Sequence, residues 1–453
     1  MKLLPLFERW LGVFAKKTIA REKPIIVAIT GSVGKSSTKN ALSFLLDPAR
    51  SFLKVRVSRK NYNNELGLPL TIFHLPAPGR SMTRWMRTLL SGWMYSVGLL
   101  RTGVELSVLE MGADKPGDLR KLCEIAPPNI VIITAVMPEG SDIVPVHAAN
   151  YPSIAAVAEE KSTLIKCLQP GGSVILNADD QEVFAMRHIT HERVFTFGQA
   201  DGTDVRIVST NLRMESSAHG FFPLGLEITL ESFNRVRKIF LPGVFGTSIA
   251  YALAAAFTVS AVLDLPWDPQ DMIDYLADHY QGLPGRTRII PGMNSTIILD
   301  DAYNASPAGM LSAIRDLGNM PLQKTQRRVA CLGEMRELGD QSEAMHRLVG
   351  AEVAKQKIDL LIACGTLAHV MRDGALVHGM SQENIRVFTD SPEAGLFLRA
   401  WLKPGDMVLV KASEGKTDPR GCRMERVVKD LMADPRKAKE LLCRQESSWK
   451  KYS

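Results

Sequence analysis

The stretch Thr30-Gly31-Ser32-Val33-Gly34-Lys35-Ser36-Ser37 decides how this chain folds. Residues 24–30 before it form a short apolar run rich in branched side chains, which is typical of a buried parallel strand. Residues 39–46 after it have the pattern of a helix. Glycines between a strand and a helix let backbone N–H groups approach phosphate oxygens at the positive end of the helix dipole. The sequence therefore predicts a phosphate-binding loop here.

The side chains of the loop indicate a nucleotide as its ligand. Lys35 would neutralise the β- and γ-phosphates, and the Ser36 hydroxyl would bind Mg²⁺. The other predicted ATP contacts of the loop are Gly31, Ser32, Gly34 and Ser37. The general pattern has a glycine five residues before Gly34, where this chain has Ile29, so the loop is a tighter form. A chance match to so short a string is the alternative interpretation.

The alternation of strand and helix continues beyond the loop. Apolar runs predict further parallel strands at 104–111, 129–135 and 173–177, with a helix at 153–168. The character then changes, and antiparallel strands at 205–208 and 226–230 are followed by an alanine-rich helix at 249–264. A second α/β rhythm has strands predicted at 296–300, 328–332, 359–363 and 407–410.

These patterns predict an α/β protein, with a P-loop central domain on a parallel-rich sheet and a Rossmann-like C-terminal domain. The expected division is an N-terminal amphipathic helix over 1–23, the ATP-binding central domain over 24–282 and the C-terminal domain over 283–453. Residues 444–451 have no apolar period, which indicates disorder at that end.

Charge and cysteine content restrict the classes of partner. The net charge is +7, from 55 Lys and Arg against 48 Asp and Glu. This is either an ordinary basic surface or a mild attraction to phosphorylated substrates or anionic lipid. No combination of aromatic and basic residues indicates nucleic acid. The six cysteines form no CxxC pair, so free thiols in a reducing cytoplasm are expected.

Two apolar stripes raise the question of membrane contact. Residues 1–23 contain no secretory signal, and no apolar run reaches the roughly 20 residues that a spanning helix needs. For this helix, packing on the protein is favoured over lying at the inner face of a membrane. A second stripe, between Trp85 and Val97, has helical spacing and is expected to be core or to contact the first helix.

Several motifs together resemble the Mur ligase family, and within it the ligases that add D-alanyl-D-alanine. Besides the loop they are Asn61-Tyr62-Asn63-Asn64-Glu65-Leu66-Gly67, Leu109-Glu110-Met111-Gly112, Asp300-Asp301-Ala302-Tyr303-Asn304-Ala305-Ser306-Pro307, Leu332-Gly333-Glu334-Met335-Arg336-Glu337-Leu338-Gly339 with His346, and Val410-Lys411-Ala412-Ser413 with Met424-Glu425. They run in family order from about residue 24 to 431, which is more specific than any single motif.

The resemblance implies an ADP-forming ligase of peptidoglycan synthesis that is a monomer. In such enzymes a carboxylate, here expected on a muramoyl tripeptide, attacks the γ-phosphate of ATP and forms an acyl phosphate. An amine, here expected from D-Ala-D-Ala, then displaces phosphate. Both steps need alignment and charge neutralisation, which the resemblance assigns to Lys35 with Mg²⁺.

The resemblance also implies roles for residues outside the loop. Glu110 and His147 match metal-ligand positions, and Lys161 matches a lysine that many members carry as a carbamate. Catalytic roles are therefore expected for Lys35, Lys161 and His147. The alternatives are a solvated strand-end carboxylate for Glu110, a structural histidine, and a helix-surface lysine paired with neighbouring glutamates.

Further matches imply ligand contacts from both domains. The ATP contacts expected outside the loop are Arg286, Asp301, Tyr303 and Asn304. The expected substrate contacts are Asn61, Asn63, Asn64, His346, Lys411, Ser413 and Glu425. For the asparagines and aspartates, ordinary turn chemistry is the alternative.

Two departures from the family concern the acceptor. Family members carry an N-terminal domain that binds the uridine diphosphate sugar, and some 23 residues before the loop cannot form one. The segment Gly246-Thr247-Ser248 also lacks the histidine usual there. A ligase for a different or lipid-linked acceptor is therefore an open alternative, as is a nucleotide-binding scaffold without ligase activity.

Overall fold

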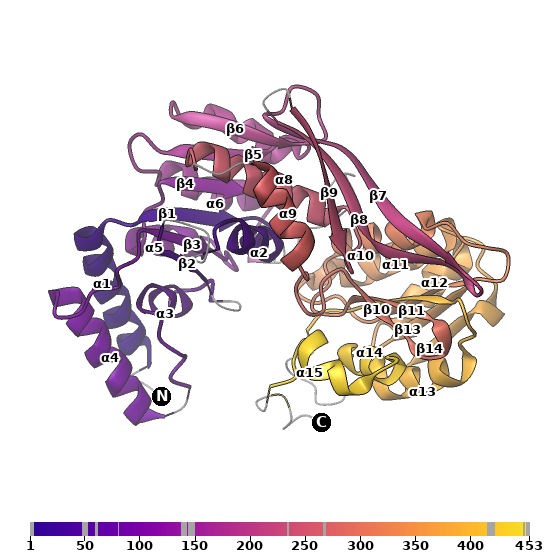
Figure 1. Ribbon diagram of the computed structural model, residues 1–453. Coiled ribbons are helices and arrows are strands. Elements are labelled where there is room, and N and C mark those ends of the chain that lie inside the picture. Colours follow the sequence, from indigo (N-terminus) through magenta and orange to yellow (C-terminus); the bar gives the residue numbers. More distant parts are fainter. Residues whose placement is uncertain are drawn as a thin grey trace.

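The computed structural model describes residues 4–47, 53–58, 62–79, 81–136, 143, 150–232, 235–265, 269–414, 422–446 and 449. Two α/β domains lie side by side, and each is built on its own sheet (Figure 1). This arrangement confirms the predicted fold class. The cysteines are free, as expected.

The sheet of the first domain has its phosphate-loop strand near the middle. In sheet order its strands are β2 (Val55–Val57), β3 (Leu106–Glu110), β1 (Ile25–Thr30), β4 (Ile130–Ile133), β5 (Ser173–Asn177), β6 (Arg193–Gly198), β7 (Val205–Ser217), β8 (Gly220–Ser232) and β9 (Arg235–Pro242). The pairs from β2 to β7 are parallel, and β7–β8 and β8–β9 are antiparallel. The strand order reverses direction at β1, and in such sheets ligands bind beside that point, at the carboxyl ends of the strands.

Alternate residues of β1 face the two layers of helices, as the two-residue period of a strand requires. Val27 and Ile29 pack with α2 (Lys35–Leu45), α8 (Ser248–Val262) and α9 (Pro269–His279). Ile26 and Ala28 pack in the cluster on the other face. The helices of that face are α1 (Leu4–Glu22), α3 (Gly67–Phe73), α4 (Met82–Val97), α5 (Asp118–Ile125), α6 (Ile154–Lys166) and α7 (Gln181–Ala185).

The N-terminal helix α1 packs beside α4 at the outer edge of the first domain (Figure 1). The rings of Phe7 and Trp85 lie 5.6 Å apart. A side chain at Gly92 would meet Leu11 and Phe14 at 3.2 and 3.3 Å, so the two helices approach closely there. Within the part of the chain that is described, no helix is long and apolar enough to cross a membrane.

A long hairpin of β7 and β8 connects the first domain to the second. The sequence indicated only short strands here, because polar residues interrupt the alternation toward the tip. At the tip, Gln326 of the second domain accepts from Phe221 N–H at 2.8 Å and donates to the Phe221 carbonyl at 3.0 Å. Gln326 also donates to the carbonyl of Gly405 at 2.9 Å. The hairpin tip is therefore held by a buried side chain of the other domain.

The chain itself passes between the domains at residues 282–288. Phe245 N–H donates to the Thr287 carbonyl at 3.0 Å, and Ile289 N–H donates to the Gly243 carbonyl at 2.8 Å. An isolated bridge also pairs Val244 with Arg288. The segment that links the two domains is thus hydrogen-bonded to the residues that follow the last strand of the first sheet.

The second domain has a mostly parallel sheet between two helical layers. In sheet order its strands are β10 (Arg288–Pro291), β11 (Ile297–Asp301), β15 (Met407–Lys411), β12 (Arg328–Leu332), β13 (Leu360–Cys364) and β14 (Ile385–Phe388), and only the β10–β11 pair is antiparallel. One face carries α10 (Pro307–Asn319), α11 (Ser342–Lys355) and α12 (Ala368–Val377). The other carries α13 (Ser391–Trp401), α14 (Glu425–Leu431) and α15 (Ala438–Leu441).

Candidate nucleotide and catalytic site

The phosphate loop connects β1 to α2 through two glycines in conformations that other residues rarely adopt. Gly31 has φ 150° and Gly34 has φ 87°. A Cβ atom on Gly31 would lie 2.0 Å from the Thr134 hydroxyl oxygen, which excludes any side chain. Helix α2 begins at Lys35, four residues earlier than the sequence pattern indicated, because the loop turns directly into the helix.

The end of β4 holds the loop in place. Ser32 N–H donates to the Ala135 carbonyl at 2.7 Å, and the Ser32 hydroxyl donates to Val136 at 3.0 Å. The Thr134 hydroxyl donates to the Val33 carbonyl at 2.5 Å. These bonds fix the loop backbone before any ligand binds, which lowers the ordering cost of binding.

The predicted metal ligands Ser36 and Glu110 are brought together by the sheet order, because β3 lies next to β1. The Ser36 hydroxyl lies 3.1 Å from both carboxylate oxygens of Glu110. Lys39, one turn along α2, pairs with Glu110 at 2.8 Å. Burial raises the pKa of Glu110, but the charges of Lys39 and Lys35 outweigh it and hold the pKa below its usual range. Glu110 is therefore a buried anion and not a solvated strand-end carboxylate.

These two oxygen-bearing side chains fit a Mg²⁺ ion. Hard divalent cations prefer carboxylate and hydroxyl oxygens and complete their shell with phosphate oxygens and water. Ser36 and Glu110 would hold the ion on the protein side. The sequence did not predict a role for Lys39, because it is an ordinary polar residue of a helix. The fold shows that its ammonium reaches Glu110.

Lys35 lies at the first position of α2, and its ammonium donates to the Gly31 carbonyl at 2.5 Å. Burial lowers its pKa, and the charge of Glu110 opposes that effect. Arg286 of the second domain is close enough to lower the pKa of Lys35 further. The phosphate loop and the domain junction are therefore electrostatically coupled.

Lys161 is buried on α6, so its interpretation as a helix-surface lysine is wrong. Burial, together with the charge of Lys35, lowers the pKa of Lys161 to about 7. Its neighbour Glu160 accepts hydrogen bonds from Gly117 N–H at 2.8 Å and Leu119 N–H at 2.9 Å. Glu160 thus holds the start of α5, and Lys161 lies close enough to Lys35 for its pKa to be affected by that charge.

The asparagine motif is only partly described, because Asn61 lies outside the described residues, as does His147. Asn64 accepts from Gly67 N–H at 2.8 Å, which is the turn chemistry considered as the alternative. The Asn63 carbonyl accepts from Gly112 N–H at 2.8 Å, beside the end of β3. Asn63 is therefore close to the Glu110 strand end, and its contact with a substrate stays a prediction.

A pocket of about 880 Å³ lies between the two domains. From the first domain it is lined by Ser36, Lys39, Asn40, Ser43, Val57, Ser58 and Tyr62, and from the second by Leu283, Pro284, Arg286, Tyr303, Glu414, Lys439, Glu440, Leu442, Cys443, Arg444, Gln445, Glu446 and Trp449. Three predicted ATP contacts, Ser36, Arg286 and Tyr303, thus line one cavity. This convergence of distant segments is the main feature of the site.

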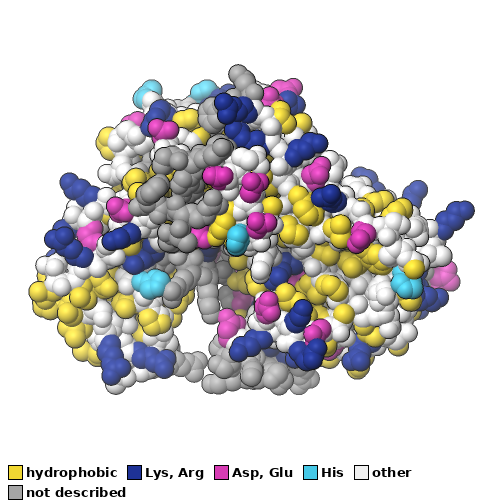
Figure 2. Space-filling view, in the orientation of Figure 1, with side chains coloured by type: hydrophobic (Ala, Val, Ile, Leu, Met, Phe, Trp, Pro, Cys, Tyr) yellow, Lys and Arg dark blue, Asp and Glu magenta, His cyan; other side chains and the backbone are white. Residues whose placement is uncertain are grey.

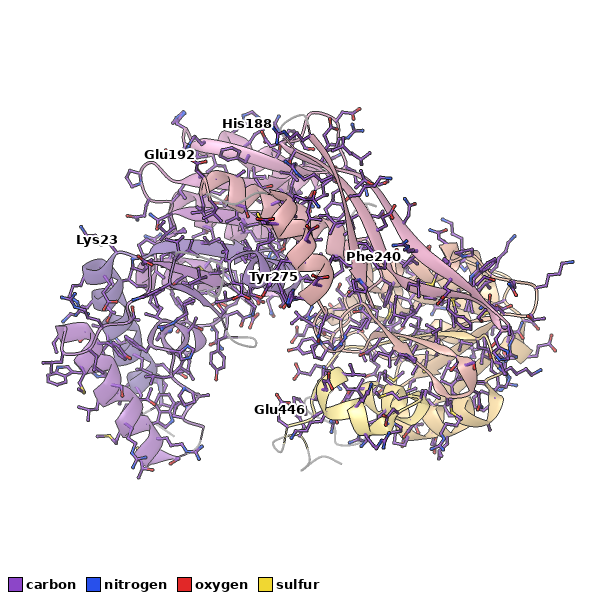
Figure 3. All side chains as sticks on the ribbon, viewed as in Figure 1. Lys23, His188, Glu192, Phe240, Tyr275 and Glu446 are labelled. Carbon is purple, nitrogen blue, oxygen red and sulfur yellow. The ribbon has the colours of Figure 1, made fainter. Side chains whose placement is uncertain are left out.

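The C-terminal segment forms much of the pocket wall, which the sequence did not indicate. Figure 3 marks Glu446 on this segment, on the side of the second domain that faces the first. Arg444, expected to be disordered, is buried and donates to the Ala302 carbonyl at 3.2 Å. The guanidinium groups of Arg286 and Arg444 lie 4.4 and 5.2 Å from the centre of the Tyr303 ring. No local pattern reports such contacts, because they depend on the tertiary fold.

Two motifs of the second domain meet at the carboxyl ends of the neighbouring strands β11 and β15. They are residues 300–307, which we call the signature loop, and residues 410–413. The Lys411 ammonium pairs with Asp301 and donates to the Asn304 carbonyl at 3.0 Å. The Ser413 hydroxyl donates to the Ala305 carbonyl at 2.8 Å. Asn304 itself is exposed. The structure thus gives Lys411 and Ser413 a role in shaping the signature loop, and their contact with a substrate stays a prediction.

His346 and Glu425 are enclosed by bonds within the chain. His346 Nε2 accepts from Met335 N–H at 3.0 Å, and its Nδ1 lies 2.6 Å from the Ser342 carbonyl. Burial lowers the pKa of His346, so the ring is the neutral form that can accept. One oxygen of Glu425 binds Arg423 at 2.7 Å and the other binds Arg444 at 3.0 Å. Both residues hold loops in place, and their predicted substrate contacts are not tested by these bonds.

Asp300 gives the second domain a specific pH dependence. Burial raises the pKa of Asp300 to about 7, although it accepts from Gly285 and Ala302 N–H. Between its ordinary pKa near 4 and 7 the folded chain binds a proton that the unfolded chain does not, so stability falls as pH rises through that window.

Asp300→Asn should remove this contribution. We expect the free energy of unfolding of the variant, measured in urea, to rise relative to the wild type between pH 5 and pH 8. Burial also raises the pKa of Asp316 to about 7. Asp316 is present in both the wild type and the variant, so its effect on the free energy of unfolding cancels in the difference between them. An identical pH dependence in the two chains would show that Asp300 is ionised throughout.

Comparisons with known proteins agree with this architecture. A model described as the Mur ligase middle domain matches residues 29–258, and one described as the Mur ligase, glutamate ligase domain matches residues 285–414. The UDP-N-acetylmuramoyl-tripeptide–D-alanyl-D-alanine ligase of Mycobacterium tuberculosis (strain ATCC 25618 / H37Rv) is 30% identical over 406 residues, which cover 86% of this chain and 70% of the relative. The ligase of the same name from Bacillus subtilis is 26% identical over 416 residues, covering 90% and 76%.

Solved structures show the same fold. The MurF ligase from Thermotoga maritima, crystallised in complex with ADP, has a TM-score of 0.71 at 24% identity, covering 93% of this chain and 83% of that one. The fold and the site define a ligase of two α/β domains whose phosphate-loop pocket is completed by the second domain. With both family models matched in order over most of its length, the chain belongs to the Mur ligase family.

Proposed function

We propose that this enzyme uses ATP and Mg²⁺ to join D-alanyl-D-alanine to the carboxylate of a muramoyl tripeptide, in the cytoplasm and as a monomer. The observation that carries the proposal is the single pocket lined by Ser36, Arg286 and Tyr303. The curated relatives named above bear the name of that reaction, and similarity extends over both domains.

The first step is the transfer of the γ-phosphoryl group to the substrate carboxylate. A carboxylate oxygen attacks the γ-phosphorus, the bond to the β,γ-bridging oxygen breaks, and ADP leaves with the electron pair. Lys35 and the N–H groups of the rigid loop stabilise the charge that develops on the phosphate oxygens. When bound, Mg²⁺ held by Ser36 and Glu110 supplies further neutralisation of that charge.

The second step replaces phosphate by an amine. The amine nitrogen attacks the carbonyl carbon of the acyl phosphate, and the tetrahedral intermediate then expels inorganic phosphate as the amine gives up a proton. The Lys411–Asp301 network holds the signature loop of the second domain, so we place the amine on that side of the pocket. Because groups from both domains are needed, the domains should close over ATP.

Lys161 supports a carbamate at this site. An amine adds CO₂ only when it is neutral, and a pKa of about 7 leaves roughly half of the side chains neutral at that pH. Reaction of the neutral amine with CO₂ forms the N–C bond, releases one proton and leaves a carbamate anion where the protonated side chain would have placed a cation. That anion would lie beside Lys35, whose positive charge favours it.

Phosphate release from ATP, measured with UDP-N-acetylmuramoyl tripeptide in the presence and absence of D-alanyl-D-alanine, tests the proposed reaction. We expect release that requires both substrates, with the pentapeptide product identified by mass. No stimulation, with ATP still bound, would overturn the acceptor assignment in favour of a different or lipid-linked acceptor. Bound ATP that no amine or carboxylate causes to turn over would favour the scaffold alternative.

Glu110→Gln tests the metal site. The substitution keeps the size of the side chain and removes the charge, so the Mg²⁺ concentration that gives half-maximal phosphate release should rise by roughly tenfold or more. Glu124→Gln is the matched control, because Glu124 is exposed on α5. An unchanged Mg²⁺ titration for Glu110→Gln would remove Glu110 from the metal site.

A further inference from the structure

The outer surface of α1 and α4 exposes an unusual number of large apolar side chains. We call it the α1–α4 face. Its exposed apolar residues are Leu4, Leu6, Trp10 and Val13 on α1, Met82, Met86, Leu90, Trp93 and Val97 on α4, and Leu99 and Leu100 after α4. Figure 2 shows hydrophobic side chains gathered at the lower left of the molecule, over these two helices. The α4 stripe was expected to be core or to contact the first helix. This holds for Trp85, which is buried beside Phe7 of α1, and Leu89 is packed against the same core. Met86, Leu90, Trp93 and Val97 are instead exposed.

The exposed residues of α4 form a continuous stripe. Met82, Met86, Leu90, Trp93 and Val97 recur every three or four residues, which places them on one side of a helix. Trp85 and Gly92 lie on a different side of the helix, against α1 and the core. Trp10 and Trp93 are 50% and 45% exposed, although large aromatic side chains are costly to leave in water.

The exposed charges around this face are basic. The exposed charged residues of α1, α4 and the turn to residue 101 are Arg9, Lys16, Lys17, Arg21, Arg84, Arg87 and Arg101, of which Arg21 is paired with Glu22 at 2.8 Å. The acidic residues of these segments, Glu8 and Glu22, are only partly exposed. Glu22 is also engaged, because it accepts from Thr102 N–H at 3.1 Å. Figure 2 shows Lys and Arg side chains at the edges of the hydrophobic region.

We propose that the α1–α4 face binds the surface of a membrane that contains anionic phospholipid. Apolar side chains with tryptophan on one helical face and basic residues beside them are the combination that binds lipid interfaces. No described helix is long and apolar enough to cross a membrane, so the face would lie on the bilayer and not span it.

A second copy of the chain is the less favoured occupant. A two-fold dimer would place this face against itself, which brings basic residues such as Arg84 and Arg87 together without acidic partners. A bilayer with anionic headgroups has the opposite charge and accepts the apolar stripe at the same time. The inference does not depend on the proposed ligase reaction, because none of these residues lines the nucleotide pocket.

The test is sedimentation of the full chain with phospholipid vesicles. Vesicles of phosphatidylcholine alone are compared with vesicles that contain phosphatidylglycerol, at low and at high salt. We expect binding only to the anionic vesicles, weaker at high salt, with a blue shift of tryptophan fluorescence. The double variant Leu90→Ser/Trp93→Ser should lose binding, and Arg84→Gln/Arg87→Gln should weaken it roughly 30-fold.

Val377→Ser/Leu396→Ser is the matched control, because these side chains are 77% and 66% exposed on the second domain. It should bind vesicles as the wild type does, and all variants should release phosphate from ATP in solution at the wild-type rate. The proposal is overturned if anionic vesicles do not bind, if phosphatidylcholine binds equally well, or if the control loses binding as well. A dimer in solution that Leu90→Ser/Trp93→Ser abolishes would overturn it in favour of self-association.

Discussion

Lys35→Ala is expected to reduce ATP-dependent phosphate release by about 10³-fold or more, because the charge that it places at the transferred phosphate has no substitute of the same geometry. Arg286 is close enough to affect the pKa of Lys35, but it belongs to the second domain and lines the pocket between the domains. The measurement is phosphate release at saturating Mg²⁺ and both substrates. The fold should persist, because Lys35 lies outside the two hydrophobic clusters of the first domain.

Lys54→Ala is the control for charge removal, because Lys54 is an exposed lysine of the same domain. It should leave the rate of phosphate release unchanged. Circular dichroism and the urea midpoint establish that each variant is folded. A folded Lys35→Ala enzyme with normal turnover would mean that the loop does not bind the transferred phosphate.

Glu425→Gln should cause the largest loss of stability among conservative substitutions in the second domain. Glu425, Arg423 and Arg444 are all at least nine-tenths buried, and the single carboxylate forms an ion pair with each of the two guanidinium groups. Removing one partner of a buried ion pair leaves an uncompensated charge and costs about 3–5 kcal/mol. The urea midpoint should fall accordingly, and the C-terminal segment should become sensitive to proteolysis because Arg444 anchors it.

The same change at an exposed pair isolates the effect of burial. Glu124 pairs with Arg120 at 3.8 Å, and both side chains are mostly exposed, so Glu124→Gln should leave the urea midpoint unchanged. Equal midpoints for Glu425→Gln and the wild type would show that solvent screens the Glu425 cluster, contrary to its burial.

The sequence predicts the features that are encoded locally. The phosphate loop, the strand that carries Glu110 and the strands of the second domain follow from apolar runs and glycines within a few residues of each other. The ends of adjacent parallel strands meet at one sheet edge, so the approach of Ser36 to Glu110 follows once the order of β3 and β1 is known. The order itself is a tertiary property that spacing does not specify.

Other features of the site are invisible to local patterns. Lys39 is one polar residue among several on α2, and only the packing of α2 against β3 makes it the partner of Glu110. Arg444 and Trp449 lie in a polar segment without apolar period, yet Arg444 contacts Tyr303 and Glu425, and the Trp449 ring lies against the guanidinium groups of Arg423 and Arg444. The segments in contact are separated by many residues in the sequence, so these contacts cannot be predicted from any short stretch of sequence.

The β7–β8 hairpin and the tied connection at residues 282–288 have a mechanical consequence. Among the described residues, the domains are tied both at Gln326 and at the Val244–Arg288 bridge, which lie at separate places. Two fixed points define a rotation axis, and a rigid domain held at both points can only rotate about that axis. Opening and closing of the enzyme should therefore be a hinge rotation about this axis. In every turnover, Arg286 and Tyr303 would approach the phosphate loop along the same path.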